Sequence, residues 1–169
     1  WMDVAMWNNC TAPALPTDGL PLYVGMDLGA TSDLTALALV WVSEGQLYVD
    51  FKAWIPEDAF KACPKHVRSV YDMAAESGQL TITQGDVADH DAVYDYLLDL
   101  TKREQLKEVA FDSWSAIHLT ARLTDAGLPM VRYDQSMKSM SPASKEAEVL
   151  IRSKTLHHLG KPFYGWCFN

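Results

Sequence analysis

The stretch LYVGMDLG, residues 22–29, decides the fold of this chain. It is an apolar run with one acidic residue, Asp27, and a short turn, ATSD, joins it to a second apolar run, LTALALVWV. A second turn, SEGQ, leads into LYVDFKAWI, where Leu47, Val49 and Phe51 alternate with more polar neighbours. Apolar runs separated by turn residues predict a three-strand meander, and the almost wholly apolar first strand is expected to be covered on both faces.

Helices and strands alternate in the rest of the chain. The pattern predicts, in order, a helix over 64–77, the strand LTIT, a helix over 92–104 capped by Asp89 or Asp91, the strand KEVAFD, a helix from near Trp114 to Gly127, the strand PMVRY and a helix over 142–153. Residues 136–144 are expected to form a polar, flexible loop. A meander followed by βαβα implies an α/β fold whose second half is parallel, with helices on both faces of a mixed sheet.

Size and charge limit the class of protein. The chain has 169 residues, of which 49% are hydrophobic, which is enough for one domain with one core. Its net charge of -8 argues against a protein that coats DNA, because nonspecific affinity comes mainly from Lys and Arg. It does not exclude a nuclease, because carboxylates that collect a divalent metal make such a site acidic.

The cysteines and the apolar runs indicate the compartment. Cys10, Cys63 and Cys167 are odd in number and widely spaced, which predicts neither a disulfide framework nor a CxxC zinc site. The longest apolar stretch, residues 34–42, is far shorter than the roughly 20 residues of a membrane helix. We therefore expect a soluble protein of a reducing cytoplasm, with no membrane partner.

The opening residues 1–20 show no clean period and contain Pro13, Pro16 and Gly19, which is typical of a linker. The stretch from Trp1 to Trp7 has the character of the end of a helix that began earlier. We expect residues 1–20 to be a linker or the tail of a preceding domain, and residues 21–169 to be the folded domain.

Two aspartates are candidate metal ligands. Asp27 stands in an apolar strand, where an unpaired charge is costly, and a hard cation such as Mg²⁺ would compensate it. Asp112 ends the strand KEVAFD just before a helix, so it is also a candidate helix cap. If the two strands are neighbours, the carboxylates lie together at the edge where open α/β sheets bind ligands. Two-metal phosphodiester cleavage needs acids placed in this way.

Other polar residues offer weaker candidates. Asp33 lies in the turn after the first strand, where turn chemistry explains it equally well. Lys138 and Lys145 belong to the one mildly basic stretch and are candidates for contacts with DNA phosphates, although a solvated surface is the alternative. The five histidines show no zinc spacing, but the pair His157-His158 is a candidate to assist a nearby site as neutral imidazole.

Seven segments resemble, in order, the nuclease half of the large terminase subunits of tailed double-stranded DNA phages: GMDLGATSDLTALALVWV, WIPED, GQLTITQGDVADHDAVYDYL, VAFDSW, LPMVRYDQS, SPASKEAEVLI and LHHLGKPFYGWCFN. This resemblance implies a ribonuclease-H-like fold and a two-metal endonuclease, using Mg²⁺ or Mn²⁺, that cuts concatemeric viral DNA during packaging. It also implies that the first twenty residues follow an ATPase domain. No GxxxxGK[ST] motif is present, so ATP hydrolysis is not expected of this stretch.

The resemblance also assigns residues and partners. It equates the family's first-strand Asp with Asp27, its fourth-strand Asp with Asp112 and the acid after the first turn with Asp33. A third metal-binding acid is expected beyond Asn169, so we expect the site to be incomplete and its activity low. The implied partners are double-stranded viral DNA, the ATPase domain, the small terminase subunit and the portal, in the cytoplasm of the infected host or of a bacterium carrying a prophage.

Two other functions stay open on sequence grounds. GMDLGAT is also similar to the first phosphate-binding turn of the actin and hexokinase superfamily of nucleotide-binding proteins, although a second turn such as DxGGGT is absent. The second is that of a noncatalytic module that docks to the packaging motor and in which the acidic residues are structural.

Overall fold

The structure, a computed structural model, describes residues 3–112 and 117–168. Its elements are, in chain order, α1 (Val4–Asn8), β1 (Pro21–Asp27), β2 (Thr35–Ser43), β3 (Gln46–Pro56), α2 (Glu57–Ala62), α3 (Lys65–Glu76), β4 (Leu80–Thr83), α4 (His90–Arg103), β5 (Gln105–Phe111), α5 (Ile117–Asp125), β6 (Met130–Arg132), α6 (Met137–Arg152), β7 (Leu156–His158) and α7 (Pro162–Phe168). The expected start of α5 near Trp114 lies outside the described residues.

One mixed sheet organises the described chain, with strand order β4-β3-β2-β1-β5-β6. β1, β2 and β3 pair antiparallel, and β5 pairs parallel with both β1 and β6. The predicted meander and the parallel second half are therefore confirmed, as is the placement of the first strand beside KEVAFD. β7, which the sequence pattern did not predict, adds to one end of β3 in parallel.

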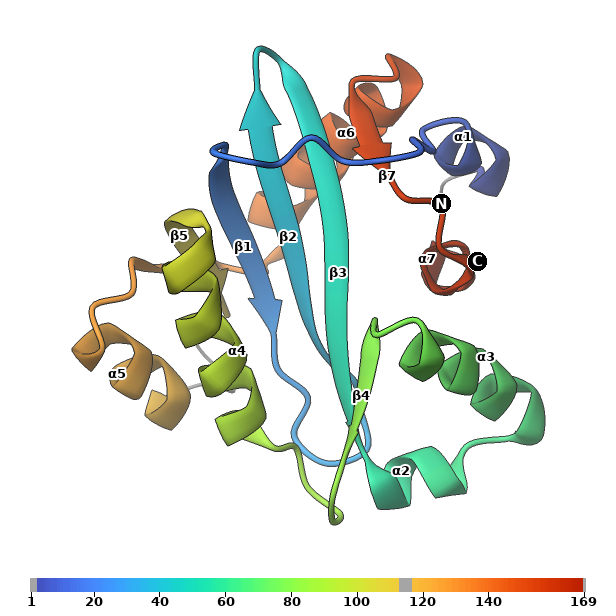
Figure 1. Cartoon of the computed structure of the whole chain (residues 1–169), viewed down its shortest axis with the longest axis vertical. Helices are drawn as coiled ribbons and strands as arrows, with labels where there is room; N and C mark the ends of the chain where they lie inside the picture. The colour runs from blue at the N-terminus through green and yellow to red at the C-terminus, as the bar shows by residue number, and fades with distance from the viewer. Residues whose placement is uncertain (1–2, 113–116, 169) are drawn as a thin grey trace.

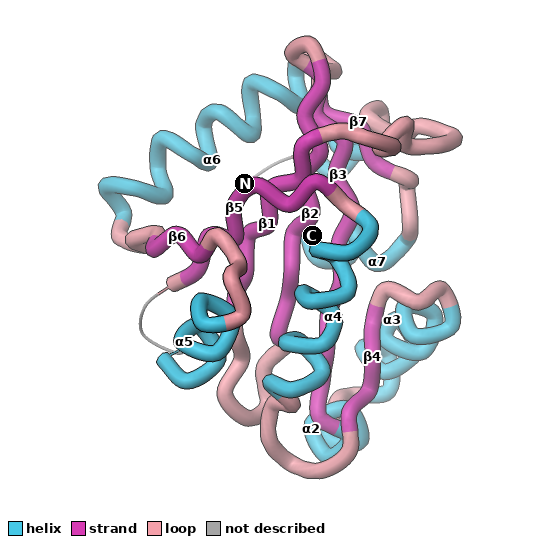
Figure 2. Tube along the Cα trace, turned by 60° about the vertical axis from the view of Figure 1, so that its left-hand side comes forward, coloured by secondary structure: helices cyan, strands magenta, loops and turns pink. Residues whose placement is uncertain are grey.

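The first face of the sheet carries the main core. α4 and α5 pack there, and Figures 1 and 2 show α4 and α6 on opposite sides of the sheet. Leu37 and Leu39 of β2 meet Val93 and Leu97 of α4 in the main core. Asp89 caps α4 by accepting hydrogen bonds from two backbone amides, at 3.0 Å each, so one of the two predicted caps is confirmed.

The second face is covered unevenly. β3 is buried there under α1, α3, α7 and the end of α6, through residues such as Val49 and Ile55. On β1, by contrast, Tyr23, Gly25 and Asp27 are exposed. The expectation that the first strand is covered on both faces was wrong, because its residues alternate between the core and an open surface.

Helix α6 begins earlier than predicted. It starts at Met137, so residues 136–144 are mostly helical, and the expectation of a flexible loop there was wrong. Pro142, taken as the first helical residue, lies inside the helix instead. A proline there lacks only the N–H that would reach the carbonyl of Lys138, and the helix continues around it.

The opening segment packs against the end of the domain. Trp7 of α1 is buried and stacks on the buried imidazole of His158 at a ring distance of 3.9 Å. His158 is held at both nitrogens, since Nδ1 accepts from the amide of Gly160 and Nε2 therefore donates to the Trp7 carbonyl. α1 starts at Val4 with Asp3 as its cap, so the expectation of a helix end was wrong. The division of the chain at residue 20 stays a prediction.

The His158 contact makes stability depend on pH. Burial lowers the pKa of His158 from its ordinary value of 6.5, and His157 acts in the same direction, against the hydrogen bond to Trp7. The unfolded chain therefore takes up a proton that the folded chain resists. The contribution is fully present above a pH of about 6.5 and is lost as the pH falls below it.

We predict that the free energy of unfolding falls more steeply between about pH 7.5 and pH 5.5 in the parent chain than in His158→Gln, which cannot titrate at this position. Urea denaturation across this range measures the difference. His118→Gln, an exposed position on α5, is the control and should keep the parent's pH dependence. An identical slope in parent and His158→Gln would contradict the prediction.

Candidate functional site

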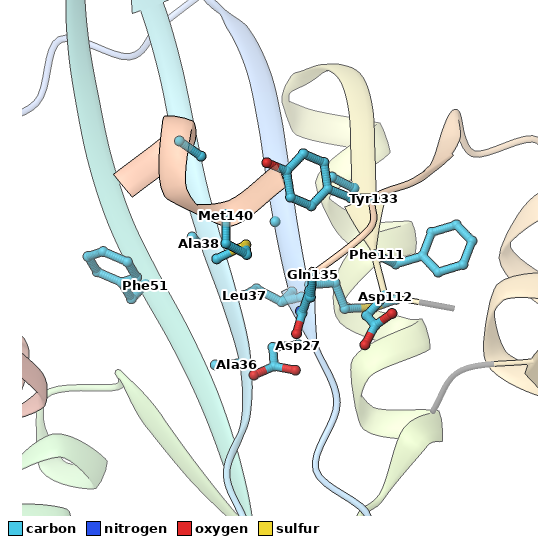
Figure 3. Close-up of a pocket in the computed structure, with 14 residues that line it drawn as sticks. Asp27, Ala36, Leu37, Ala38, Phe51, Phe111, Asp112, Tyr133, Gln135 and Met140 are labelled. Atoms are coloured by element: carbon cyan, nitrogen blue, oxygen red, sulfur yellow. The ribbon is translucent and has the colours of Figure 1, made fainter. Parts of the chain in front are cut away.

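A groove of about 560 Å³ lies on the open part of the second face, between the sheet and the first half of α6. Its floor consists of small residues on three adjacent strands, and its other side carries larger side chains such as Tyr133 and Met140. Figure 3 shows Asp27 and Asp112 at this groove. The small floor residues are Gly25, Ala36, Ala38 and Ala110.

The sheet register brings the two predicted metal ligands together. Met26 of β1 pairs with Phe111 of β5 in parallel, so Asp27 and Asp112 follow as neighbours at the same end of adjacent strands. Strands in a sheet lie roughly 4.8 Å apart, and both side chains line the same groove. The prediction that they lie together is confirmed.

Within the part of the chain that the structure describes, no cationic side chain pairs with either carboxylate. Among residues 3–112 and 117–168, neither Asp27 nor Asp112 forms an ion pair or a side-chain hydrogen bond with another described residue. Asp27 is exposed to solvent, so the desolvation cost expected from its apolar neighbours does not apply. The pairing of two like charges is the feature that calls for compensation, and carboxylate oxygens are the donors that a hard divalent cation prefers.

Asp33, the acid predicted after the first turn, lies outside the groove. Asp33 is exposed in the loop between β1 and β2 and is not among the residues that line the groove. The loop is fixed behind Asp27, because the amide of Gly29 donates to Thr35 Oγ1 at 3.1 Å and the backbone of Asp33 closes over Gly29. No group of three or more His, Cys, Asp or Glu side chains suited to a metal occurs in the described part of the chain.

The remaining candidates are not among the residues that line the groove. Lys138 lies in the first turn of α6, and Lys145 lines a second hollow on the outer side of that helix, together with Met137 and Met140. His157 and His158 lie on β7 at the opposite end of β3 from Asp27, and they serve packing and hydrogen bonding. The idea that this pair assists the site was wrong.

Sequence reasoning missed two groove residues, Tyr133 and Gln135. They belong to the connection from β6 to α6, which was read as part of a strand and a loop. The sequence pattern did not indicate that α6 begins at Met137, and it gave no sign that the two side chains before it line the groove.

The family model for the terminase large subunit, endonuclease domain, matches residues 1–169. The chain belongs to this family. The large terminase subunit of Enterobacteria phage HK97 is 28% identical over 166 residues, which make up 96% of this chain and 33% of that protein. This chain therefore spans about a third of the length of the curated relative that it matches.

Solved structures of terminases share the fold. The crystal structure of the HK97 large terminase has a TM-score of 0.85 with 27% identity, over 98% of this chain and 35% of that one. The large terminase nuclease of the thermophilic phage G20c, solved with bound magnesium, has a TM-score of 0.55 with 10% identity, over 88% of this chain and 61% of that one. The predicted ribonuclease-H-like α/β fold is confirmed.

The close packing of the loop that follows Asp27 in this terminase domain can be tested by substitution at Gly29. A Cβ at Gly29 would lie 2.5 Å from the backbone oxygen of Asp33, so Gly29→Ala must displace backbone. We predict that it lowers the free energy of unfolding by about 1–3 kcal/mol, as overpacking does. Gly25→Ala is the matched control, because its Cβ would meet only Ala38 Cβ at 3.9 Å and should change stability by about 0.5 kcal/mol or less.

Urea denaturation measures both variants. Equal stability of Gly29→Ala and Gly25→Ala would show that the loop moves freely, and would contradict the fixed geometry described behind Asp27.

Proposed function

We propose that this domain is a metal-dependent endonuclease that cuts concatemeric viral DNA during genome packaging. The observation that carries the proposal is the pair formed by Asp27 and Asp112, which lie on adjacent strands and form no ion pair with any residue that the structure describes. Membership of the terminase endonuclease family supports the reaction class. The magnesium-bound nuclease of phage G20c supports the choice of a divalent ion, Mg²⁺ or Mn²⁺.

The two aspartates and the small residues of the groove floor would have different roles in the reaction. Asp27 and Asp112 would hold the divalent cation or cations that the reaction needs. A bound divalent cation supplies charge stabilisation for the leaving oxygen and lowers the pKa of an attacking water. The small floor beside them lets a sugar-phosphate backbone approach the sheet closely, because Gly25, Ala38 and Ala110 project almost no side chain.

The role of Asp33 is a separate part of the proposal. It lies outside the groove lining, on a loop that Gly29 holds close to the end of β1. We place it as an outer carboxylate that affects the site through this loop rather than as a direct cation ligand. Lys138 and Lys145 are proposed to contact DNA phosphates from α6, which would offset part of the domain's negative charge.

The partners follow from the family. We propose double-stranded viral DNA as substrate, and the ATPase domain, the small terminase subunit and the portal as partners in the host cytoplasm. The HK97 relative is about three times the length of this chain, which leaves room for an ATPase domain in the same protein. None of the described helices is long and apolar enough to cross a membrane.

Cleavage of plasmid DNA tests the function. In Mn²⁺, we predict that Asp27→Ala and Asp112→Ala each reduce the cleavage rate by about 100-fold or more, because several kcal/mol of charge stabilisation are lost. Asp72→Ala, at an exposed position on α3, is the matched control and should leave the rate unchanged.

Cleavage that survives both site substitutions would overturn the assignment. Stabilisation by a nucleotide, but not by Mn²⁺ alone, would favour a nucleotide-binding domain. Absence of any Mn²⁺ binding would favour a noncatalytic docking module.

A further inference from the structure

The connection between β6 and α6 delivers a polar side chain to the site. The amide of Tyr133 donates to the carbonyl of Phe111 at 2.9 Å, which extends the pairing of β5 and β6 by one residue, next to Asp112. Tyr133 and Gln135 line the groove, whereas Asp134 does not.

Hydrogen bonds hold this connection in place. Asp134 accepts from the amide of Ser136 at 3.0 Å and from its hydroxyl at 2.6 Å, and the Tyr133 hydroxyl donates to the carbonyl of Ser139 at 3.1 Å. These bonds from Ser136 lower the pKa of Asp134, so its carboxylate stays charged and its bonds persist at neutral pH. Gln135 is therefore carried by a backbone that is fixed on both sides.

The Gln135 side chain is aimed at the two carboxylates. Figure 3 shows it descending from the connection toward Asp27, with Asp112 on its other side. Among the described residues, the side-chain amide of Gln135 forms no hydrogen bond. Within the described part of the chain, Gln135 is therefore a polar side chain without a hydrogen bond, and it lines the same groove as the carboxylates of Asp27 and Asp112.

We propose that Gln135 contributes a third ligand to this metal centre, its amide oxygen binding the divalent cation held by Asp27 and Asp112. This inference rests on the proposed function. Amide oxygens are accepted ligands of hard cations, but they are weaker than carboxylates because they carry no charge. A neutral ligand would add to the two carboxylates at a site to which the described residues offer no third carboxylate.

Isothermal titration of the chain with Mn²⁺ tests the ligand directly, without relying on activity. Gln135→Leu removes the oxygen at similar size and should weaken Mn²⁺ binding by about 10-fold. Gln135→Glu replaces it with a carboxylate and should tighten binding by about 10-fold, because charge is added where the cation sits. Gln84→Leu and Gln84→Glu, at an exposed turn after β4, are the matched controls and should bind as the parent does.

The outcomes distinguish the ligand role of Gln135 from the proposed nuclease function. If Asp27→Ala abolishes Mn²⁺ binding while both Gln135 variants bind as the parent does, the ligand role is overturned and the nuclease proposal stands. If the parent binds no Mn²⁺, both are overturned. Thermal unfolding without metal checks that each variant folds, and Gln135→Glu keeps the test decisive should Gln135→Leu fail to fold.

Discussion

The parallel pairing of β1 with β5 is the constraint on which the site depends. These strands are far apart in the sequence, yet their register places Asp27 beside Asp112 at one end of the sheet. A shift of one residue in either strand would turn its aspartate to the face covered by α4 and α5. Leu22, Val24 and Val109 resist such a shift, because all three are buried on that face. The core therefore fixes the geometry of the site.

Much of this arrangement was predictable from sequence, because it rests on local patterns. The meander follows from apolar runs separated by turns, and the helix α4 follows from its apolar stripe and the cap at Asp89. The pairing of Asp27 with Asp112 needed one further step, a fold analogy that places the first strand next to KEVAFD. Strand-end position pointed to both residues, and the register places them side by side.

The features that escaped prediction depend on tertiary contacts. β7 has only three residues, two of them histidines, and it exists because β3 and the opening segment pair with it. The helix α6 starts before Pro142, where local rules place a helix start. Gln135, which lines the groove, lies just before that early start. In each case the decisive partner lies far away in the sequence or depends on the chain's path.

Asp27 was chosen as a candidate metal ligand for a reason that the structure only partly supports. Its apolar neighbours suggested a buried charge that needs compensation, yet alternation along β1 puts those neighbours and the carboxylate on opposite faces. What makes Asp27 unusual is a second carboxylate beside it on an open surface. Its apolar partners Met26 and Leu28 are buried beneath the sheet and hold the strand in register. The apolar sequence around Asp27 thus positions the charge on the open face rather than burying it, which is the placement that the proposed cation site requires.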